Sequence, residues 1–221
     1  MQIRLTDLIA PSFYEVHHAV KSGVATHFLL SGGRGSTKSS FAAIEIILGM
    51  MRDPQANAVA LRKVKDTIRE SVFEQLLWAI EKLGVRHLWH ASVSPMRLTY
   101  ISTGQTIIFR GADNPRKVKS GKLRRGYVKY IWYEEADEFS IEDIRTINQT
   151  FMRGGDSFRV FYTYNPPKSR KAWVHEYKNN SPPGWFVHHS TYLDVPREWL
   201  GEQFFVEAET LRQRNELAYR H

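Results

Sequence analysis

Short apolar runs alternate with longer amphipathic stretches along the chain. The runs are rich in β-branched and aromatic residues, and they occupy residues 27–31, 58–61, 129–133, 159–164 and 185–188. Apolar runs of this length predict buried strands. Over residues 39–51 and 66–83, apolar side chains recur at helical spacing instead, which predicts helices. Strands separated by helices predict an α/β fold with a mostly parallel central sheet flanked by helices.

Two local signals add detail to this outline. Residues 98–101 and 106–109, joined by a Ser-Thr-Gly-Gln turn, predict a β-hairpin. Ser140 is followed three positions later by Asp143, which is a partial capping box and predicts a helix that begins after Ser140. Both features fit between the expected strands and leave the α/β assignment unchanged.

The last part of the chain predicts a lid or a connector. We expect a long helix over residues 196–219, because Pro196 suits the first turn of a helix. No clear linker divides the chain before about residue 180. We therefore expect a core domain over residues 1–180, followed by a terminal strand and helix over residues 181–221.

A glycine-rich turn, GGRGSTKS, lies between the first predicted strand and the first predicted helix. Glycines let backbone N–H groups approach phosphate oxygens, and the helix N-terminus that follows favours anions. Lys38 supplies a charge for the β- and γ-phosphates of ATP, and the Ser39 hydroxyl is placed to bind Mg²⁺. The predicted nucleotide-binding residues are Gly32, Gly33, Arg34, Gly35, Ser36, Thr37, Lys38, Ser39 and Ser40. The alternative is a glycine-rich turn with an incidental lysine.

One position departs from the usual phosphate-loop pattern, in which a glycine precedes the lysine. Thr37 stands there instead. Glycine normally relieves backbone crowding at that point. We therefore expect Gly33 and Gly35 to adopt the unusual backbone dihedrals in its place.

Two adjacent glutamates end the apolar run YIWY. Side chains alternate along a strand, so the two carboxylates are expected to point to different sides. We assign Glu134 to Mg²⁺, together with Ser39, and Glu135 to the attacking water. The alternative is that both belong, with Asp137 and Glu138, to the solvated start of a helix, where acidic side chains are favoured.

Polar side chains also end the next predicted strand. Thr163 and Asn165 are placed to contact the γ-phosphate or the attacking water and to respond to its loss. The Asn-Pro sequence favours turns, so plain turn chemistry explains the same residues about equally well.

Nearly all of the net charge lies in one stretch of the chain. The formal net charge is +8, and residues 110–129 carry eight basic side chains against one acidic side chain. Such a cluster attracts the phosphates of a nucleotide or of a nucleic-acid backbone. We take Lys117, Lys119, Arg124 and Arg125 as residues that contact DNA or phosphate. A solvated loop is the alternative.

Composition excludes several other classes of protein. The chain has no cysteine, which excludes disulfides and Cys-ligated zinc or iron–sulfur sites. It has no apolar run long enough to cross a bilayer, and Arg4 and Asp7 interrupt the region that a signal peptide would need. We therefore expect a soluble, intracellular protein without a membrane partner.

Together, these motifs resemble a known family. The strings SGGRGSTKSS, YIWYEEADEF and FYTYNPP are similar to motifs of the N-terminal ATPase of the large terminase subunit of tailed bacteriophages, PBSX-type branch. The resemblance covers roughly residues 12–180, with the motifs in the right order. It implies a P-loop ATPase fold of the additional-strand, catalytic-glutamate type.

The resemblance implies a motor that hydrolyses ATP with Mg²⁺ and moves double-stranded DNA into a procapsid. Catalysis would then fall to Glu135 and Lys38, and Arg34 would neutralise charge at the γ-phosphate. The resemblance also matches residues 162–167 to the family's coupling motif, so that Thr163 and Asn165 would couple hydrolysis to movement. For Arg34, a helix cap or a surface salt bridge is the alternative. Other arginines that could serve a neighbouring subunit are Arg62, Arg110, Arg116, Arg124 and Arg125.

The same resemblance implies partners and a location. It implies a portal protein, a small terminase subunit, and a homo-oligomeric ring in the host cytoplasm. The family usually continues into a nuclease domain, but the acidic residues after Pro182 lie mostly on one predicted helix, so nuclease activity is not expected from this chain. Two other functions stay open: a helicase-like or recombinase-like DNA motor, and a nucleotide-dependent assembly module without significant turnover.

Overall fold

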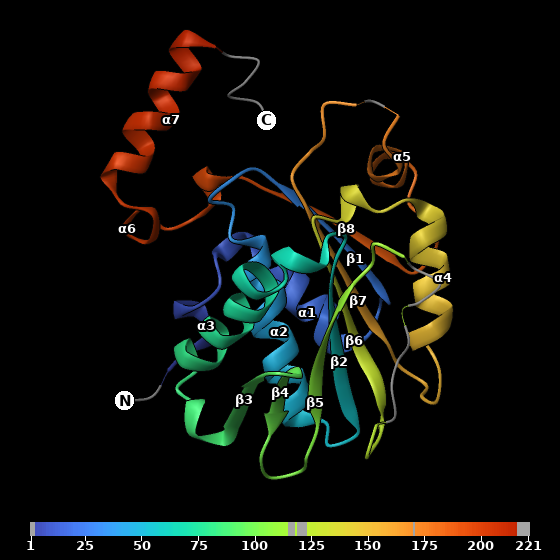
Figure 1. Ribbon diagram of the computed structural model, residues 1–221. Coiled ribbons are helices and arrows are strands. Elements are labelled where there is room, and N and C mark those ends of the chain that lie inside the picture. The colour runs from blue at the N-terminus through green and yellow to red at the C-terminus, as the bar shows by residue number, and fades with distance from the viewer. Residues whose placement is uncertain (1–2, 115–117, 119–122, 170, 216–221) are drawn as a thin grey trace.

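The computed structural model describes residues 3–114, 118, 123–169 and 171–215. Its centre is an eight-stranded sheet in the order β3-β4-β5-β2-β6-β7-β1-β8 (Figure 1). The strands are β1 (His27–Gly32), β2 (Ala56–Arg62), β3 (Trp89–Val93), β4 (Met96–Tyr100), β5 (Thr106–Gly111), β6 (Tyr127–Glu134), β7 (Arg159–Tyr164) and β8 (Trp185–Ser190). From β5 across to β8 every pairing is parallel. The predicted mostly parallel sheet is therefore confirmed.

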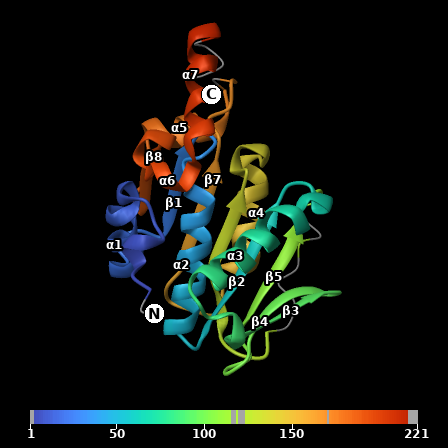
Figure 2. The ribbon, with the colours of Figure 1, turned by 90° about the vertical axis from the view of Figure 1, so that its left-hand side faces the viewer.

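Helices cover both faces of the sheet. They are α1 (Tyr14–Ser22), α2 (Lys38–Arg52), α3 (Glu74–Lys82), α4 (Ile141–Phe151), α5 (Trp173–Asn179), α6 (Arg197–Leu200) and α7 (Glu202–Arg214). Helices α1, α2 and α3 lie on one face, and α4 and α5 lie on the other (Figures 1 and 2). Each face has its own buried core, with Ile44 and Leu76 in the first and Ile144 and Val174 in the second.

The predicted helix over residues 66–83 is divided into three helical types. It consists of the 3₁₀ turn η3 (Lys65–Thr67), the π-helical turn η4 (Arg69–Phe73) and α3. Val72 and Leu76 are both fully buried, so one apolar stripe continues through the change. An apolar stripe of this kind does not distinguish an α-helix from a π-helical turn. The other short turns are η1 (Leu5–Asp7), η2 (Pro11–Phe13), η5 (Arg86–Leu88), η7 (Ala136–Glu138) and η8 (Tyr192–Asp194).

The single terminal helix predicted over residues 196–219 is wrong. Gly201, with a φ of +79°, separates the short α6 from α7. Only glycine adopts this backbone conformation at little cost, so the chain changes direction there. Helix α7 extends away from the sheet (Figure 1), and residues 216–219 lie outside the described part of the chain.

The two local signals in the sequence are confirmed. Strands β4 and β5 pair antiparallel, as the predicted hairpin requires, although β3 on the other side of β4 was not predicted. At the start of α4, the Ser140 hydroxyl accepts from the Asp143 N–H at 3.1 Å, and the Asp143 carboxylate accepts from the Ser140 N–H at 3.1 Å. This is a complete capping box, which fixes where the helix begins.

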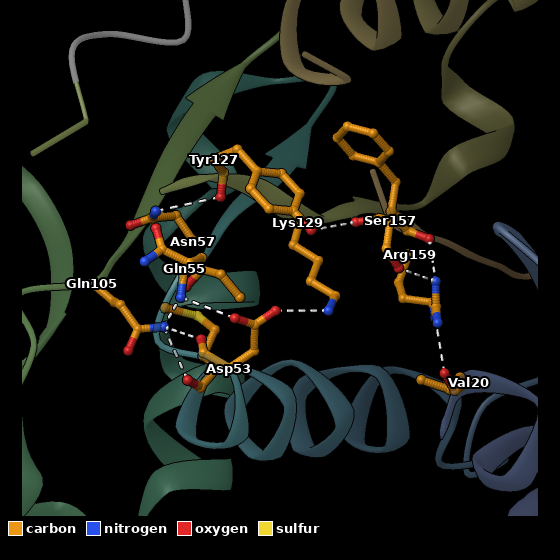
Figure 3. Close-up of polar contacts among 12 residues, drawn as sticks. Val20, Asp53, Gln55, Asn57, Gln105, Tyr127, Lys129, Ser157 and Arg159 are labelled. Carbon is orange, nitrogen blue, oxygen red and sulfur yellow. Dashed lines mark hydrogen bonds and ion pairs between the residues drawn. The ribbon is translucent and has the colours of Figure 1, made fainter. Parts of the chain in front are cut away.

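A polar cluster holds the loops at the amino ends of the parallel strands (Figure 3). The Gln105 amide nitrogen lies 2.8 Å from the Asp53 carbonyl oxygen and 2.5 Å from that of Ala56. The Asp53 carboxylate accepts from Lys129 at 2.8 Å. The two Gln105 contacts supply hydrogen-bond partners to backbone carbonyl oxygens. The ion pair with Asp53 involves Lys129, one of the basic residues of the stretch 110–129.

Candidate functional site: a phosphate loop beside two glutamates

The phosphate loop is the segment between the end of β1 and the first residue of α2, Lys38. A β-carbon on Gly32 would lie 2.4 Å from the Ser190 carbonyl oxygen, so only glycine fits there. Gly35 has a φ of +78°, as expected. Gly33 does not adopt the left-handed conformation; Thr37 adopts it instead, with a φ of +60°. The threonine keeps the backbone shape of the usual glycine at a cost of about 1–2 kcal/mol.

Lys38 lies at the bottom of this loop and is 9% exposed. Its ammonium group donates to the Asn165 side-chain oxygen at 2.8 Å and to the Gly33 carbonyl oxygen at 3.4 Å. Burial lowers the pKa of Lys38, and the negative charge of Glu134 acts in the opposite direction. A desolvated ammonium group with only neutral hydrogen-bond partners binds an anion strongly. The structure thus brings the predicted Lys38 and Asn165 together.

Ser39 and Glu134 meet across the gap between α2 and β6. The Ser39 hydroxyl lies 2.8 Å and 3.0 Å from the two carboxylate oxygens of Glu134. Burial raises the pKa of Glu134, and hydrogen bonds from Thr163 and Ser39 lower it. The side chains predicted to bind Mg²⁺ are therefore adjacent. Thr163 lies within this group, where its hydroxyl contacts Glu134.

Glu135 has a different partner from Glu134. It follows the last residue of β6 and has a φ of +55°, which turns the chain at this point. Its carboxylate forms an ion pair with the guanidinium of Arg62, at the end of the neighbouring strand β2. Arg62 also lies 4.0 Å from Glu138. Arg62 is 6% exposed, so its side chain does not extend outward from the surface of the chain.

Arg34 and the remaining loop residues form the rim of a small pocket. This pocket has a volume of about 280 Å³ and is lined by residues 33–40 and Asn165. Arg34 is exposed, while Ser36 is buried. A much larger cavity of about 760 Å³ adjoins it at Thr37 and Ser40. Its other walls come from η1, η4, α3, α6 and the end of β6, and they include Trp78, Trp132, Glu134 and Trp199.

The loop also contacts the terminal helix α7. The ring of Phe204 lies so close to Gly35 that a β-carbon on this glycine would be 2.7 Å from it. Phe204 in turn packs edge-on against Tyr192, with ring centroids 5.5 Å apart. Gly35 is thus required both for its φ and for the close approach of α7.

The basic stretch is only partly described. Arg124 and Arg125 are exposed, whereas Lys117 and Lys119 lie outside the described residues. Arg110 is half-buried, and burial together with the nearby Arg97 lowers its pKa. Within the described ranges no helix is long and apolar enough to cross a membrane. In those same ranges no cluster of three or more His, Asp or Glu side chains is placed to hold a metal.

The order of the strands completes the assignment of the fold. Strand β7, which carries Thr163, lies between the loop strand β1 and the acidic strand β6. An extra strand at this place, with a phosphate loop on one side and a carboxylate pair on the other, defines the additional-strand class of P-loop folds. Within that class, the chain belongs to the phage terminase large subunit family. The sequence model of this family matches residues 24–221.

Two relatives illustrate the similarity in sequence. The chain is 44% identical over 227 residues to the large terminase subunit of Bacillus phage SPP1, covering all of this chain and 53% of that protein. It is 34% identical over 141 residues to the PBSX phage terminase large subunit of Bacillus subtilis, covering 64% of this chain and 31% of that protein. The chain thus spans about half the length of the SPP1 protein and matches about a third of the PBSX protein.

The fold is shared with solved large terminases. The large terminase of a thermophilic bacteriophage, in complex with ADP, superimposes with a TM-score of 0.71 at 12% identity, covering 96% of this chain and 52% of that one. The ATPase domain of the Thermus phage P74-26 large terminase gives a TM-score of 0.63 at 18% identity, covering 93% of this chain and 90% of that one.

Proposed function

We propose that this chain is the ATP-hydrolysing motor part of a phage large terminase, which drives double-stranded DNA into a procapsid. The observation that carries the proposal is the convergence of Lys38, Ser39, Glu134 and Glu135 at one edge of the sheet. A loop that only bound a nucleotide would need no second carboxylate beside the first. Family membership and the SPP1 relative support the packaging role.

Nucleotide binding would use the loop backbone and Lys38. N–H groups of the loop at the N-terminus of α2 would donate to phosphate oxygens. Lys38 would exchange its contacts with Gly33 and Asn165 for the β- and γ-phosphates. The arrival of the phosphates would then release Asn165, which suits the coupling role assigned to this residue.

Ser39 and Glu134 suit a magnesium ion. They place three oxygen atoms together beside the loop, and magnesium commonly takes one or two protein oxygens with phosphate and water as its other ligands. Bound there, Mg²⁺ would neutralise charge on the β- and γ-phosphates.

Glu135 would accept the proton of the attacking water. A carboxylate in this role needs to lie within hydrogen-bond distance of the water, either directly or after rearrangement. Glu135 is paired with Arg62, so this ion pair has to open or shift before the carboxylate can reach a water at the γ-phosphate. Arg34, on the exposed rim, would stabilise the charge that develops on the transferred phosphoryl group.

The nucleoside would occupy the larger cavity beside Thr37 and Ser40. Its acidic lining would accept hydrogen bonds from ribose hydroxyls, and Trp199 offers a ring for stacking. Trp199→Ala is expected to weaken ATP binding about tenfold, because base–aromatic stacking contributes roughly 1–3 kcal/mol. Titration with a fluorescent ATP analogue measures this. Affinity for inorganic tripolyphosphate should not change, and an equal loss for both ligands would contradict the placement.

A phosphate-release assay tests the proposed function. The expected result is magnesium-dependent ATP hydrolysis that duplex DNA stimulates, measured both with the chain alone and with DNA and procapsid portal present. ATP binding without phosphate release under any of these conditions would favour the assembly module. Strand separation on a forked duplex would favour a helicase-like motor.

Exposed arginines of the basic stretch are proposed to contact the DNA backbone. Replacing both Arg124 and Arg125 by Gln is expected to lower the slope of log affinity against log salt by about 2 for duplex DNA, because two phosphate contacts are lost. The matched control replaces Lys21 and Lys82, exposed on α1 and α3, and changes the net charge equally. Equal slopes in all three proteins would assign the stretch to a solvated loop.

Family membership also supports a proposal about partners. We propose that the chain binds a portal protein and a small terminase subunit, and that it forms a ring of identical subunits in the host cytoplasm. Co-sedimentation of the chain with portal rings tests the first of these directly. Oligomer size with bound ATP analogue and DNA tests the ring.

A further inference from the structure

Trp132 makes a buried hydrogen bond that the proposed mechanism does not use. It lies on β6 with an exposed fraction of 0%, two positions before Glu134 and therefore on the same face of the strand. Its indole nitrogen lies 2.7 Å from the hydroxyl oxygen of Thr163. An indole N–H can only donate, so the Thr163 oxygen is the acceptor.

This donation limits what the Thr163 hydroxyl can do. A hydroxyl group has one proton, and the indole occupies one of its lone pairs. Two acceptors remain within reach: the Tyr133 carbonyl oxygen at 3.2 Å and the Glu134 carboxylate, which is closer. Hydrogen bonds to an ionised acceptor are the stronger ones. The Thr163 proton is therefore directed at Glu134.

The strand register makes this arrangement rigid. Thr163 on β7 is the direct partner of Glu134 on β6 in the parallel pairing. The carboxylate is thereby held by two hydroxyl groups, those of Thr163 and Ser39. Thr163 is itself 0% exposed, so water does not substitute for either of its partners.

We propose that Trp132 is a positioning residue: its indole N–H fixes the Thr163 hydroxyl, which fixes the Glu134 carboxylate over Ser39. The inference rests on the proposed function, in which Glu134 and Ser39 hold Mg²⁺ beside the phosphates. Thr163 thereby acts on the metal-binding carboxylate in addition to any coupling role. Partners that orient a metal-binding side chain typically change metal affinity by about 10- to 100-fold when they are lost.

The test compares Trp132→Phe with a matched control, Trp89→Phe. Trp89 is also buried, at 2% exposed, and its indole nitrogen has no hydrogen-bond partner in the described part of the chain. Calorimetry measures the affinity for ADP with and without Mg²⁺. In Trp132→Phe we expect the magnesium-dependent gain in ADP affinity, taken as the ratio of the affinities with and without Mg²⁺, to fall about tenfold. Trp89→Phe should retain the full gain.

A spectroscopic signature tests the link through Thr163 without nucleotide. The indole N–H resonance that disappears in Trp132→Phe belongs to Trp132. This resonance should shift in Thr163→Val, which lacks the hydroxyl, and should stay near its original position in Thr163→Ser, which retains it. In the magnesium assay, Trp132→Phe combined with Thr163→Val should lose little more than Thr163→Val alone.

Each outcome separates the inference from the function. A wild-type chain with no magnesium-dependent gain would overturn the proposed function and this inference with it. A normal gain in wild type that Trp132→Phe leaves unchanged, or loses only to the extent that Trp89→Phe does, would overturn this inference alone. A Trp132 indole N–H resonance that does not shift in Thr163→Val would also overturn this inference alone.

Discussion

Glu135→Gln is expected to slow ATP hydrolysis about a thousandfold while leaving ATP binding intact. Glutamine has nearly the same shape as glutamate but cannot accept a proton from water, and loss of a positioned general base typically costs about 10²–10⁴-fold in rate. The phosphate-binding groups, Lys38 and Ser39, are on a different element and keep their positions. Single-turnover phosphate release and ATPγS titration measure the two effects separately.

Glu138→Gln is the matched control for this prediction. The carboxylates of Glu135 and Glu138 are about equally exposed, at 42% and 41%, and both face Arg62. Both substitutions therefore remove one negative charge from the same guanidinium. If the charge near Arg62 were all that mattered, the two variants would lose activity equally. Unchanged turnover in Glu135→Gln would remove the catalytic assignment.

Arg62 shows why a sequence alone could not describe the state of the catalytic glutamate. Its partner lies more than seventy positions later in the chain, and the two meet because β2 and β6 are neighbours in the parallel sheet. Strand order is a property of the whole fold, and the motif containing Glu135 carries no information about it. From the sequence, Arg62 could only be named as one of five arginines that could contact the γ-phosphate, with no reason to prefer it.

The local motifs were predictable because their chemistry is contained in a few consecutive residues. The phosphate loop, the acidic end of β6 and the capping box at Ser140 each join a backbone requirement to a particular side chain. The meeting of Ser39 with Glu134 also followed, since the carboxyl ends of parallel strands share one edge of a sheet. The backbone of Thr37 did not follow, because its residue type argues against the left-handed conformation that it adopts.

Secondary structure was predictable where buried positions leave a clear pattern of apolar residues in the sequence. Strands β1, β2, β6, β7 and β8 are apolar runs in the sequence, whereas β3 has the burial pattern of a partly exposed edge strand and contains His90, which is exposed. The division of residues 65–82 into three helical types leaves the apolar stripe unchanged. Only tertiary packing selects among such types.

Lys38→Ala is expected to weaken ATP binding at least about a hundredfold without lowering the stability of the fold. A buried ammonium group that meets a phosphate contributes roughly 2–5 kcal/mol, and about 2.7 kcal/mol corresponds to a hundredfold change in affinity. In the nucleotide-free protein, burial works against the charged form, as the lowered pKa of Lys38 indicates. Removing the charge should therefore leave the free energy of unfolding in urea unchanged or higher.

Lys129→Ala separates this effect from the general cost of losing a partly buried lysine. Lys129 forms its ion pair with Asp53 (Figure 3), which caps the C-terminal end of α2, whereas Lys38 begins this helix. This variant should lose stability, because Asp53 keeps a charge without its partner, and should bind ATP normally. A loss of ATP affinity without a loss of stability is expected only for a lysine that binds the ligand. Such a lysine lowers the stability of the ligand-free protein, and ligand binding offsets this loss. Normal ATP affinity in Lys38→Ala would contradict the assignment of the loop.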